Sequence, residues 1–185
     1  MSSTVPQGDD TATALFSRDF DALETGETFV TSGRTITEAD VVSFAGLTGD
    51  FHPQHVDEEW ASQSQFGERV AHGMLVLSVA VGLVPLDPER VLALRRISDA
   101  VFKRPARLGD TVRVEGKVES VREIDEGTGL VGCTWKIIGP EGAAFARVKV
   151  EVLWRRGEPG AAEPAASDDT EGAAAAPDPS SGLPL

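Results

Sequence analysis

The sequence predicts an α+β domain in which an antiparallel sheet wraps around one central apolar helix. Residues 110–124, 129–138 and 143–156 alternate apolar and polar side chains with the period of a strand. Residues 73–84, GMLVLSVAVGLV, are apolar on nearly every side and end before Pro85, so we expect a helix that is buried all round. Strands with one apolar face need a cover, and this helix is the natural one.

The part of the chain before that helix is expected to hold one strand and two shorter helices. Residues 27–37 are rich in Thr, Val and Phe, as strands are. From residue 38 onward the apolar residues are spaced near 3.6, with Thr37 as a cap and Gly49 as the stop. A second short helix is expected to begin at Asp57, because acidic residues follow it and suit the positive end of a helix.

The two ends of the chain differ in composition from the part between them. From Gly157 onward the sequence consists mostly of Ala, Pro, Gly, Ser and acidic residues, which bury too little surface to offset the entropy of ordering. The first dozen residues are also expected to be loose. We therefore expect disordered segments at residues 1–14 and 157–185, on either side of a single domain over residues 15–156.

Charge and cysteine content argue against several classes of function. The formal net charge is −13, which disfavours nucleic acid and anionic membranes as partners. Cys133 is the only cysteine and cannot form an internal disulfide, which fits a reducing compartment. No apolar run has the length of a membrane span, and the N-terminus lacks the pattern of a signal peptide. The sequence predicts a cytoplasmic protein.

Two of the three histidines lie in the stretch GDFHPQH, residues 49–55. Pro53 prevents one helix from running through it, so it should connect two helices. Asp50 and His55 could transfer protons, because a carboxylate beside an imidazole fixes its tautomer and can hold a water. Taken alone, the stretch favours the alternative that they cap the two helix ends. A metal site is least expected, since His52 and His55 lack the spacing of a helical zinc pair.

The third histidine, His72, stands with Gly73 at the expected start of the apolar helix. The first N–H groups of a helix have no internal partner and the helix dipole is positive there, which suits a carbonyl oxygen that gains negative charge. A glycine at this point lets a ligand approach the backbone closely. His72, taken alone, is interpreted as a capping or core residue.

Together, GDFHPQHVDEEWAS and the downstream FGERVAHGMLVLS resemble the MaoC-like dehydratases and (R)-specific enoyl-CoA hydratases. The signature of that family runs Gly-Asp-x-Asn-Pro-x-His and then Ala-His-Gly-Met-Leu. The later VFKRPARLGDTVRVEGKV is similar to a further segment of the family, so the resemblance covers about residues 25–155. It implies a hot-dog fold that pairs with a second subunit, as a homodimer, with an acyl thioester tunnel near the interface.

The resemblance also implies a lyase of fatty acid metabolism. Such an enzyme adds water to a 2-enoyl thioester or removes it from an (R)-3-hydroxyacyl thioester. Asp50 and His55 would form the catalytic dyad, and the N–H of Gly73 would bind the thioester oxygen. The implied substrate carrier is coenzyme A or an acyl carrier protein, and neither a cofactor nor a metal is expected. Which member of the dyad moves which proton stays open.

Three positions depart from the family pattern. His52 replaces the usual Asn and is expected to keep its role as a hydrogen-bonding brace, although its titratable ring could shift the pKa values of the dyad. Gln54 replaces a residue that is usually aliphatic. Some members carry a Ser where this chain has Val81, and Ser78 could substitute for it only in part. The candidates for binding the substrate are therefore Gly73, His72, His52 and Ser78.

A basic segment follows the apolar helix and contains Arg90, Arg95, Arg96, Lys103, Arg104 and Arg107. Lys103, Arg104 and Arg107 could bind the phosphates of coenzyme A or the acidic face of a carrier protein. The alternative is an ordinary solvated strand face. Two other functions also remain open: a hot-dog acyl thioesterase, and a non-catalytic thioester-binding subunit of a heterodimer.

Overall fold

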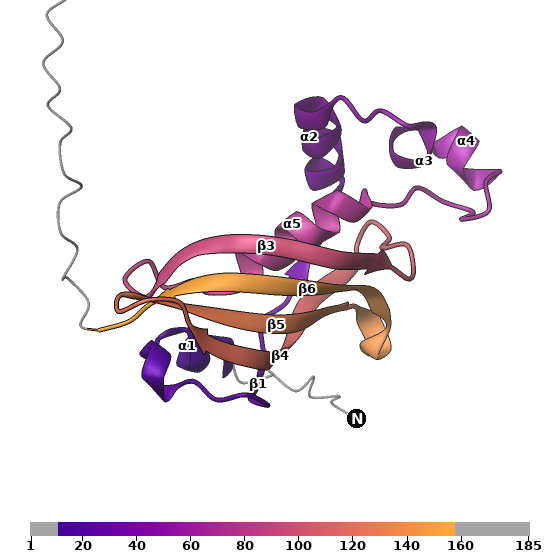
Figure 1. Ribbon diagram of the computed structural model, residues 1–185. Helices are drawn as coiled ribbons and strands as arrows, with labels where there is room; N and C mark the ends of the chain where they lie inside the picture. The colour runs from indigo at the N-terminus through magenta and orange to yellow at the C-terminus, as the bar shows by residue number, and fades with distance from the viewer. Residues whose placement is uncertain (1–10, 158–185) are drawn as a thin grey trace, which may run out of the picture.

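Figure 1 shows the computed structural model, which describes residues 11–157. Within this range six antiparallel strands form a sheet with the order β1-β4-β5-β6-β3, and β2 pairs with β4. The strands are β1 Thr28–Val30, β2 Arg34–Thr35, β3 Val91–Phe102, β4 Thr111–Glu123, β5 Thr128–Ile138 and β6 Ala144–Arg155. The helices are α1 Thr11–Phe16, α2 Glu38–Thr48, α3 Pro53–Val56, α4 Glu58–Ser62 and α5 Gly73–Leu83, with short 3₁₀ turns at Phe20–Ala22 and Pro140–Gly142.

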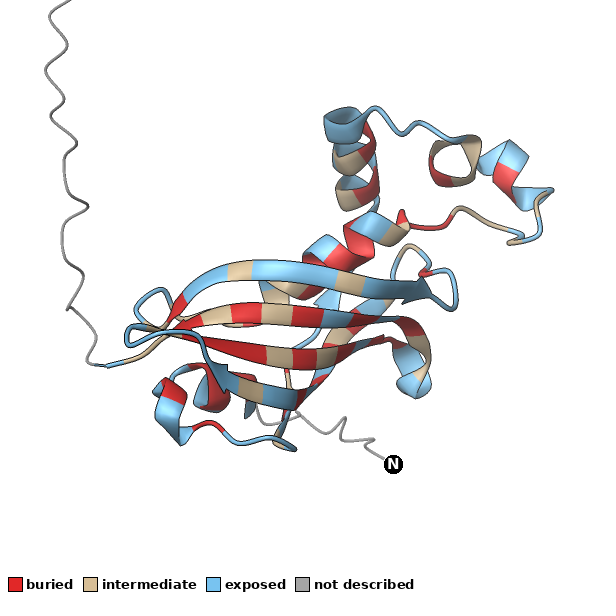
Figure 2. Cartoon of the chain, viewed as in Figure 1, coloured by how far each residue is buried: buried red, intermediate tan, exposed pale blue. Residues whose placement is uncertain are grey.

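The predicted fold class is confirmed, because α5 packs on β4 and β5 and its inner side joins the apolar face of the sheet in one core. Strands β4, β5 and β6 alternate buried with more exposed residues over most of their length, as Figure 2 shows. Trp135 of β5 and Trp154 of β6 are fully buried and fill much of this core. Among residues 11–157 no helix has the length and apolarity that crossing a bilayer needs.

The outer strand β3 was named from the sequence only as an alternative, the solvated strand face proposed for the basic segment. It pairs with β6 along one edge, and the register shifts three times between Val91 and Val101. Each shift adds or skips a residue, so the alternation of apolar and polar side chains is lost. Most of β3 is exposed in the single chain, and four of its apolar side chains are open to solvent: Leu92, Ile97, Val101 and Phe102.

Two expectations about burial and boundaries were wrong. The helix α5 is not buried all round: Met74 is 56% exposed, and Ser78 and Gly82 are also exposed. These positions repeat every four residues and form one stripe that the described residues do not cover. At the N-terminus, the folded part begins earlier than residue 15, because Ala12 of α1 is fully buried. Phe16 anchors α1 on the sheet, with its ring 5.4 Å from that of Trp154.

Residues 1–10 and 158–185, which hold most of the two expected disordered segments, lie outside the described residues. The remaining helices, α2 to α4, project beyond the sheet at the N-terminal end of α5 (Figure 1), and we call them the overhang. The predicted cap of α2 is confirmed: Thr37 and Asp40 form a reciprocal capping box. Gly49 ends α2 with a φ of +78°, which glycine adopts without strain.

The expected link between two helices contains a helix of its own. Pro53 occupies the first position of α3, where its missing N–H costs nothing. The imidazole of His52 accepts the N–H of Gln54 and so caps α3. Arg69, just before α5, pairs with Glu38 of α2 and with Glu58 of α4. These ion pairs and caps fix a segment that has few apolar contacts of its own.

Candidate active site

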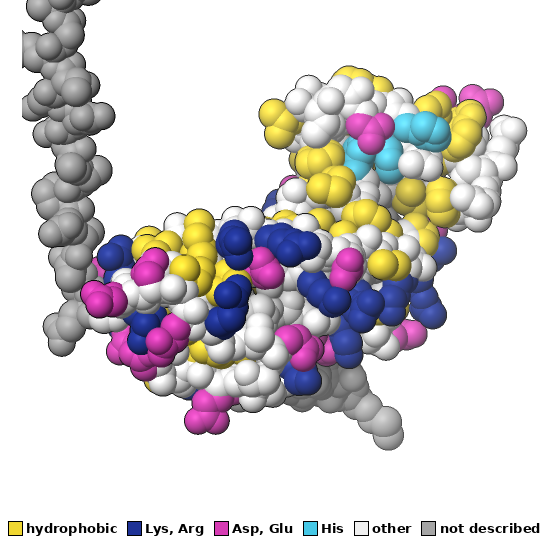
Figure 3. All heavy atoms as spheres, in the orientation of Figure 1, with side chains coloured by type: hydrophobic (Ala, Val, Ile, Leu, Met, Phe, Trp, Pro, Cys, Tyr) yellow, Lys and Arg dark blue, Asp and Glu magenta, His cyan; other side chains and the backbone are white. Residues whose placement is uncertain are grey.

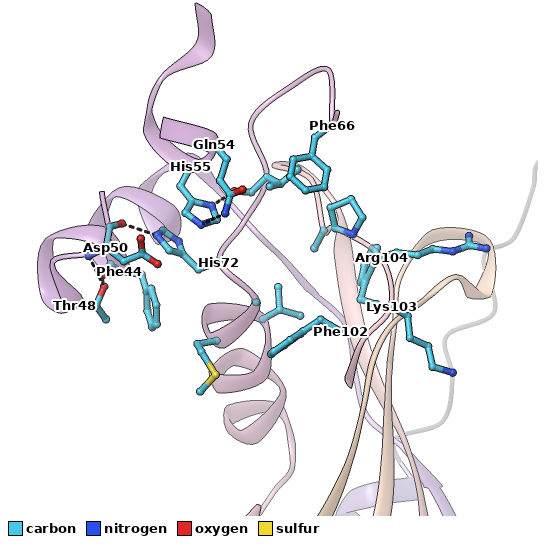
Figure 4. A pocket seen from close by; sticks show the side chains of 17 residues that line it. Phe44, Thr48, Asp50, Gln54, His55, Phe66, His72, Phe102, Lys103 and Arg104 are labelled. Carbon is cyan, nitrogen blue, oxygen red and sulfur yellow. Dashed lines mark hydrogen bonds between the residues drawn. The ribbon is translucent and has the colours of Figure 1, made fainter. Parts of the chain in front are cut away.

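A cavity of about 760 Å³ lies between the overhang, the start of α5 and the loop after β3. Asp50, Gln54, His55 and His72 line one side, and Phe102, Lys103 and Arg104 line another, as Figure 4 shows. Figure 3 shows the histidine side chains grouped on the overhang, close to hydrophobic side chains. The cavity therefore combines ionisable groups with apolar walls, which is typical of small-molecule sites.

His55 projects from α3 and is 5% exposed. Its Nδ1 lies 2.6 Å from the carbonyl oxygen of Val70. A carbonyl only accepts, so Nδ1 carries the proton and Nε2 presents a lone pair when the ring is neutral. The side-chain amide of Gln54 lies 3.0 Å from that Nε2.

Burial is the largest cause that lowers the pKa of His55 below its usual 6.5. The hydrogen bond to Val70 opposes this shift, as does the charge of Asp50. The neighbouring rings of His72 and His52 lower the pKa further. The lowered pKa favours the neutral ring, which can accept a proton through Nε2.

His72 contacts both Asp50 and His55. Its Nε2 donates to the backbone carbonyl of Asp50 over 3.0 Å, and its ring stacks on that of His55 with centroids 3.7 Å apart. Nitrogen or carboxylate atoms of all three residues lie within 4.8 Å of one another. The structure thus brings the predicted dyad together and adds His72 as its support. His72 is 2% exposed, in agreement with its interpretation as a core residue.

The same three groups are the candidate ligands for a metal ion in the described part of the chain. The lone pairs of imidazole lie in the ring plane, and the rings of His55 and His72 are stacked with a tilt of 26°. Two lone pairs in nearly parallel planes do not converge on one ion. This geometry is poor for a metal, and the expectation of a metal-free site remains a prediction.

Gly73 stands at the first turn of α5 and lines the cavity. His72 is the N-cap residue, but its side chain makes no capping bond because it is used on Asp50. The first N–H groups of α5 therefore have no side-chain acceptor among the described residues. A methyl group at position 73 would lie 3.0 Å from ring carbons of Phe102, so glycine keeps this approach open.

His52 and Ser78 lie outside the lining of the cavity. The backbone N–H of His52 donates to a carboxylate oxygen of Asp50 over 3.3 Å, and its ring packs edge-on against Trp60. This agrees with a brace and not with direct binding. Ser78 faces a separate hollow and its hydroxyl donates to the carbonyl of Met74. Five residues beyond Gly73, it points to a different side of α5, so the structure does not bring this candidate to the cavity.

The basic residues do not form one patch. Arg90 pairs with Asp19 and Asp87, and Arg95 and Arg96 lie near Glu151. Arg107 pairs with Glu68 at 2.8 Å and does not line the cavity. Lys103 and Arg104 do line the cavity.

Three contributions to the site were not assigned from the sequence. The carbonyl of Val70 fixes the tautomer of His55, and Phe102 closes on Gly73. Neither leaves a sequence signal, because a backbone group and a β3 side chain reach the site through the fold. The amide of Gln54 on His55 had a signal, since Gln54 is a polar residue where the family is usually aliphatic.

Comparison with known proteins agrees with this architecture. The sequence model of the family described as MaoC like domain matches residues 21–134. Protein MaoC of Klebsiella aerogenes is 40% identical over 100 residues, which are 54% of this chain and 30% of that protein. The 3-hydroxybutyryl-CoA dehydratase of Methylorubrum extorquens is 36% identical over 110 residues, 58% of this chain and 66% of that protein. The matched part thus spans less than two thirds of either relative.

Solved structures give the same result for the fold. The monoamine oxidase regulatory protein from Archaeoglobus fulgidus superposes with a TM-score of 0.71 at 34% identity, over 76% of this chain and 96% of that one. A Mycobacterium tuberculosis protein described as a double hot-dog fold has a TM-score of 0.68 at 22% identity, over 89% of this chain and 53% of its own. The α+β architecture described above is therefore a hot-dog fold.

Proposed function

This chain belongs to the family of MaoC-like domains, and on that premise we propose that it is a hydro-lyase acting on acyl thioesters. It adds water to a 2-enoyl thioester or removes water from an (R)-3-hydroxyacyl thioester. One observation carries the proposal: Asp50 and His55 meet within 4.8 Å in the cavity that also exposes the start of α5. A proton-transfer pair and an oxyanion site then face one substrate.

The thioester oxygen is bound at the first turn of α5, by the N–H of Gly73. As water adds to C3, the electrons of the double bond move toward this oxygen, and an enolate forms. The N–H group and the positive end of the helix dipole stabilise that charge. Phe102 and Phe66 provide an apolar wall of the cavity, which limits competing water.

The proton inventory balances with a neutral His55. Its Nε2 takes one proton from the water while the water oxygen bonds to C3. The imidazolium then returns this proton to C2 as the enolate collapses, so the ring is neutral again. Asp50 orients the water and stabilises the imidazolium, and dehydration follows the same steps in reverse.

Lys103 and Arg104 are proposed to receive the carrier. Both line the cavity, and neither is in an ion pair with the described part of the chain. A phosphate of coenzyme A or an acidic side chain of a carrier protein can pair with them.

A second copy of this chain is the proposed partner. Among residues 11–157 no strand pairs with the outer edge of β3, which exposes apolar side chains. The stripe on α5 that begins at Met74 is also exposed. An unpaired edge with apolar side chains is a template for strand pairing. Two copies related by a twofold axis can cover both features.

The function is tested by supplying 2-enoyl thioesters of different chain lengths on both carriers and reading the stereochemistry of the product. We expect (R)-3-hydroxyacyl thioester to form. Release of free thiol without hydration would instead indicate a thioesterase. A folded protein that is inert on every substrate would contradict the proposal and favour a non-catalytic subunit.

A further inference from the structure

The direction of the hydrogen bond between Gln54 and His55 follows from the groups around the ring. Nδ1 of His55 donates to the carbonyl of Val70, so Nε2 carries only a lone pair in the neutral ring. The amide nitrogen of Gln54 lies 3.0 Å from Nε2. The amide must therefore donate, and it occupies the lone pair that a proton would take.

The backbone of Gln54 is held on both sides, which fixes where its side chain reaches. Its N–H donates to Nδ1 of His52 over 3.2 Å. Its carbonyl accepts the N–H of Val70 over 3.1 Å. Val70 therefore holds Gln54 through its N–H and His55 through its carbonyl, so these two side chains form one unit at the wall of the cavity.

We propose that Gln54 is a positioning residue that keeps the basic nitrogen of His55 unprotonated and aligned until the reacting water takes the place of the amide. An N–H donor at Nε2 stabilises the neutral ring, whereas an imidazolium would set two N–H groups against each other. The amide then gives way to water, which donates its proton to the same lone pair. The replacement of the amide by water rests on the proposed hydration, whereas the stabilisation of the neutral ring by Gln54 does not.

Other charged groups also act on the same ring. Asp50 lies on one side and favours the imidazolium, while His72 and His52 disfavour it. Lys103 and Arg104 line the same cavity. Gln54 differs from all of these because its amide contacts Nε2 of His55 directly. Replacing this hydrogen-bond donor by an acceptor should therefore raise the pKa of His55, which the donor lowers.

The test is the substitution Gln54→Glu, with Gln65→Glu as the matched control. Both add one carboxylate to the segment before α5, but Gln65 is exposed, and within residues 11–157 the side chain of His55 bonds to Gln54 and Val70 instead. In Gln54→Glu the new acceptor pairs with Nε2–H, and the pKa of His55 should rise by about one unit or more. In the control it should change by less than about 0.3 unit. Histidine NMR titration of the ligand-free protein measures both without any need for activity.

The kinetic arm measures kcat/KM for hydration against pH. Gln54→Glu should move the acidic limb upward and lower kcat/KM at pH 6.5 about threefold to tenfold, with recovery at higher pH. The size-matched Gln54→Leu should shift the limb upward by less. Equal pKa values of His55 in Gln54→Glu and Gln65→Glu would overturn the inference. If the pKa of His55 shifts in Gln54→Glu but the native protein has no hydratase activity, the contact between Gln54 and His55 is supported. The proposed function is then contradicted instead.

Discussion

The sheet with α5 and the overhang are built by different means, although they meet at one cavity. The sheet and α5 share a continuous apolar core that includes Trp135 and Trp154. The overhang buries little and depends on caps, backbone bonds and the ion pairs of Arg69. The core supplies stability and holds the helix end, whereas the less apolar overhang places the ionisable groups. The division predicts that activity and stability respond to different substitutions.

The largest difference between the effect on activity and the effect on stability is expected for Asp50 and His55. Asp50→Asn and His55→Ala should each lower kcat by about 10²–10⁴-fold, because a positioned acid or base is lost. Thermal unfolding should change little for Asp50→Asn, since Asp50 is exposed. Steady-state kinetics and a melting curve measure the two effects, and near-normal turnover in either variant would refute the dyad.

The opposite result is expected in the core. Trp154→Ala removes a fully buried side chain that contacts Phe16 and donates to the carbonyl of Arg18. The free energy of unfolding should fall by about 3–5 kcal/mol, measured by denaturant titration. A loss below about 1 kcal/mol would show that α1 and the sheet do not form the packed unit described.

A methyl group at position 73 tests whether the start of α5 binds the thioester oxygen. In Gly73→Ala the new methyl meets the ring of Phe102, so the ring or the bound thioester must shift. We expect kcat to fall by about tenfold, with little change in unfolding. The double variant Gly73→Ala with Phe102→Leu should recover part of the loss if the contact is the cause. If kcat does not recover in the double variant, the loss comes from contact of the new methyl group with the bound thioester.

A smaller effect is expected at the mouth of the cavity. Arg104→Ala should raise KM by about threefold to tenfold with kcat nearly unchanged, since a carrier contact outside the reacting atoms is lost. Arg107→Ala is the matched control, because Arg107 is engaged with Glu68 outside the cavity. A fall in kcat alone for Arg104→Ala, or equal effects of both variants, would contradict the carrier site.

The smallest effect concerns the pH dependence. Because the pKa of His55 is lowered, the base stays unprotonated below pH 6.5 and the acidic limb of kcat/KM should lie there. Activity is lost as pH falls through the pKa of the folded protein. His52→Asn removes one of the charges that lower this pKa, so the limb should move slightly upward. A downward shift would contradict this sign.

The sequence predicted the core better than the overhang for physical reasons. One-sided alternation identified β4 to β6, because each of these strands keeps one face on the core. Alternation did not identify β3, because its register shifts break the pattern. For α5 the helix was predicted correctly, but its burial on all sides was not, because the stripe that begins at Met74 is exposed in a single chain.

In the candidate site, Asp50 and His55 were predicted as a pair because the family motif supplies both, and the structure brings them together. Ser78 and Arg107 lie outside the cavity, since sequence proximity does not give the direction of a side chain. The carbonyl of Val70 and the ring of Phe102 could not be predicted, because they enter the site through tertiary packing.

Hydration in isotopically labelled water tests most directly whether the overhang and the end of α5 act together as a hydro-lyase. The product of a 2-enoyl thioester would be isolated and the position of the label found by mass spectrometry. The account predicts label on C3 of a 3-hydroxyacyl thioester with the native protein, and almost none with folded His55→Ala. Label in a free carboxylate, or equal labelling by both proteins, would contradict it.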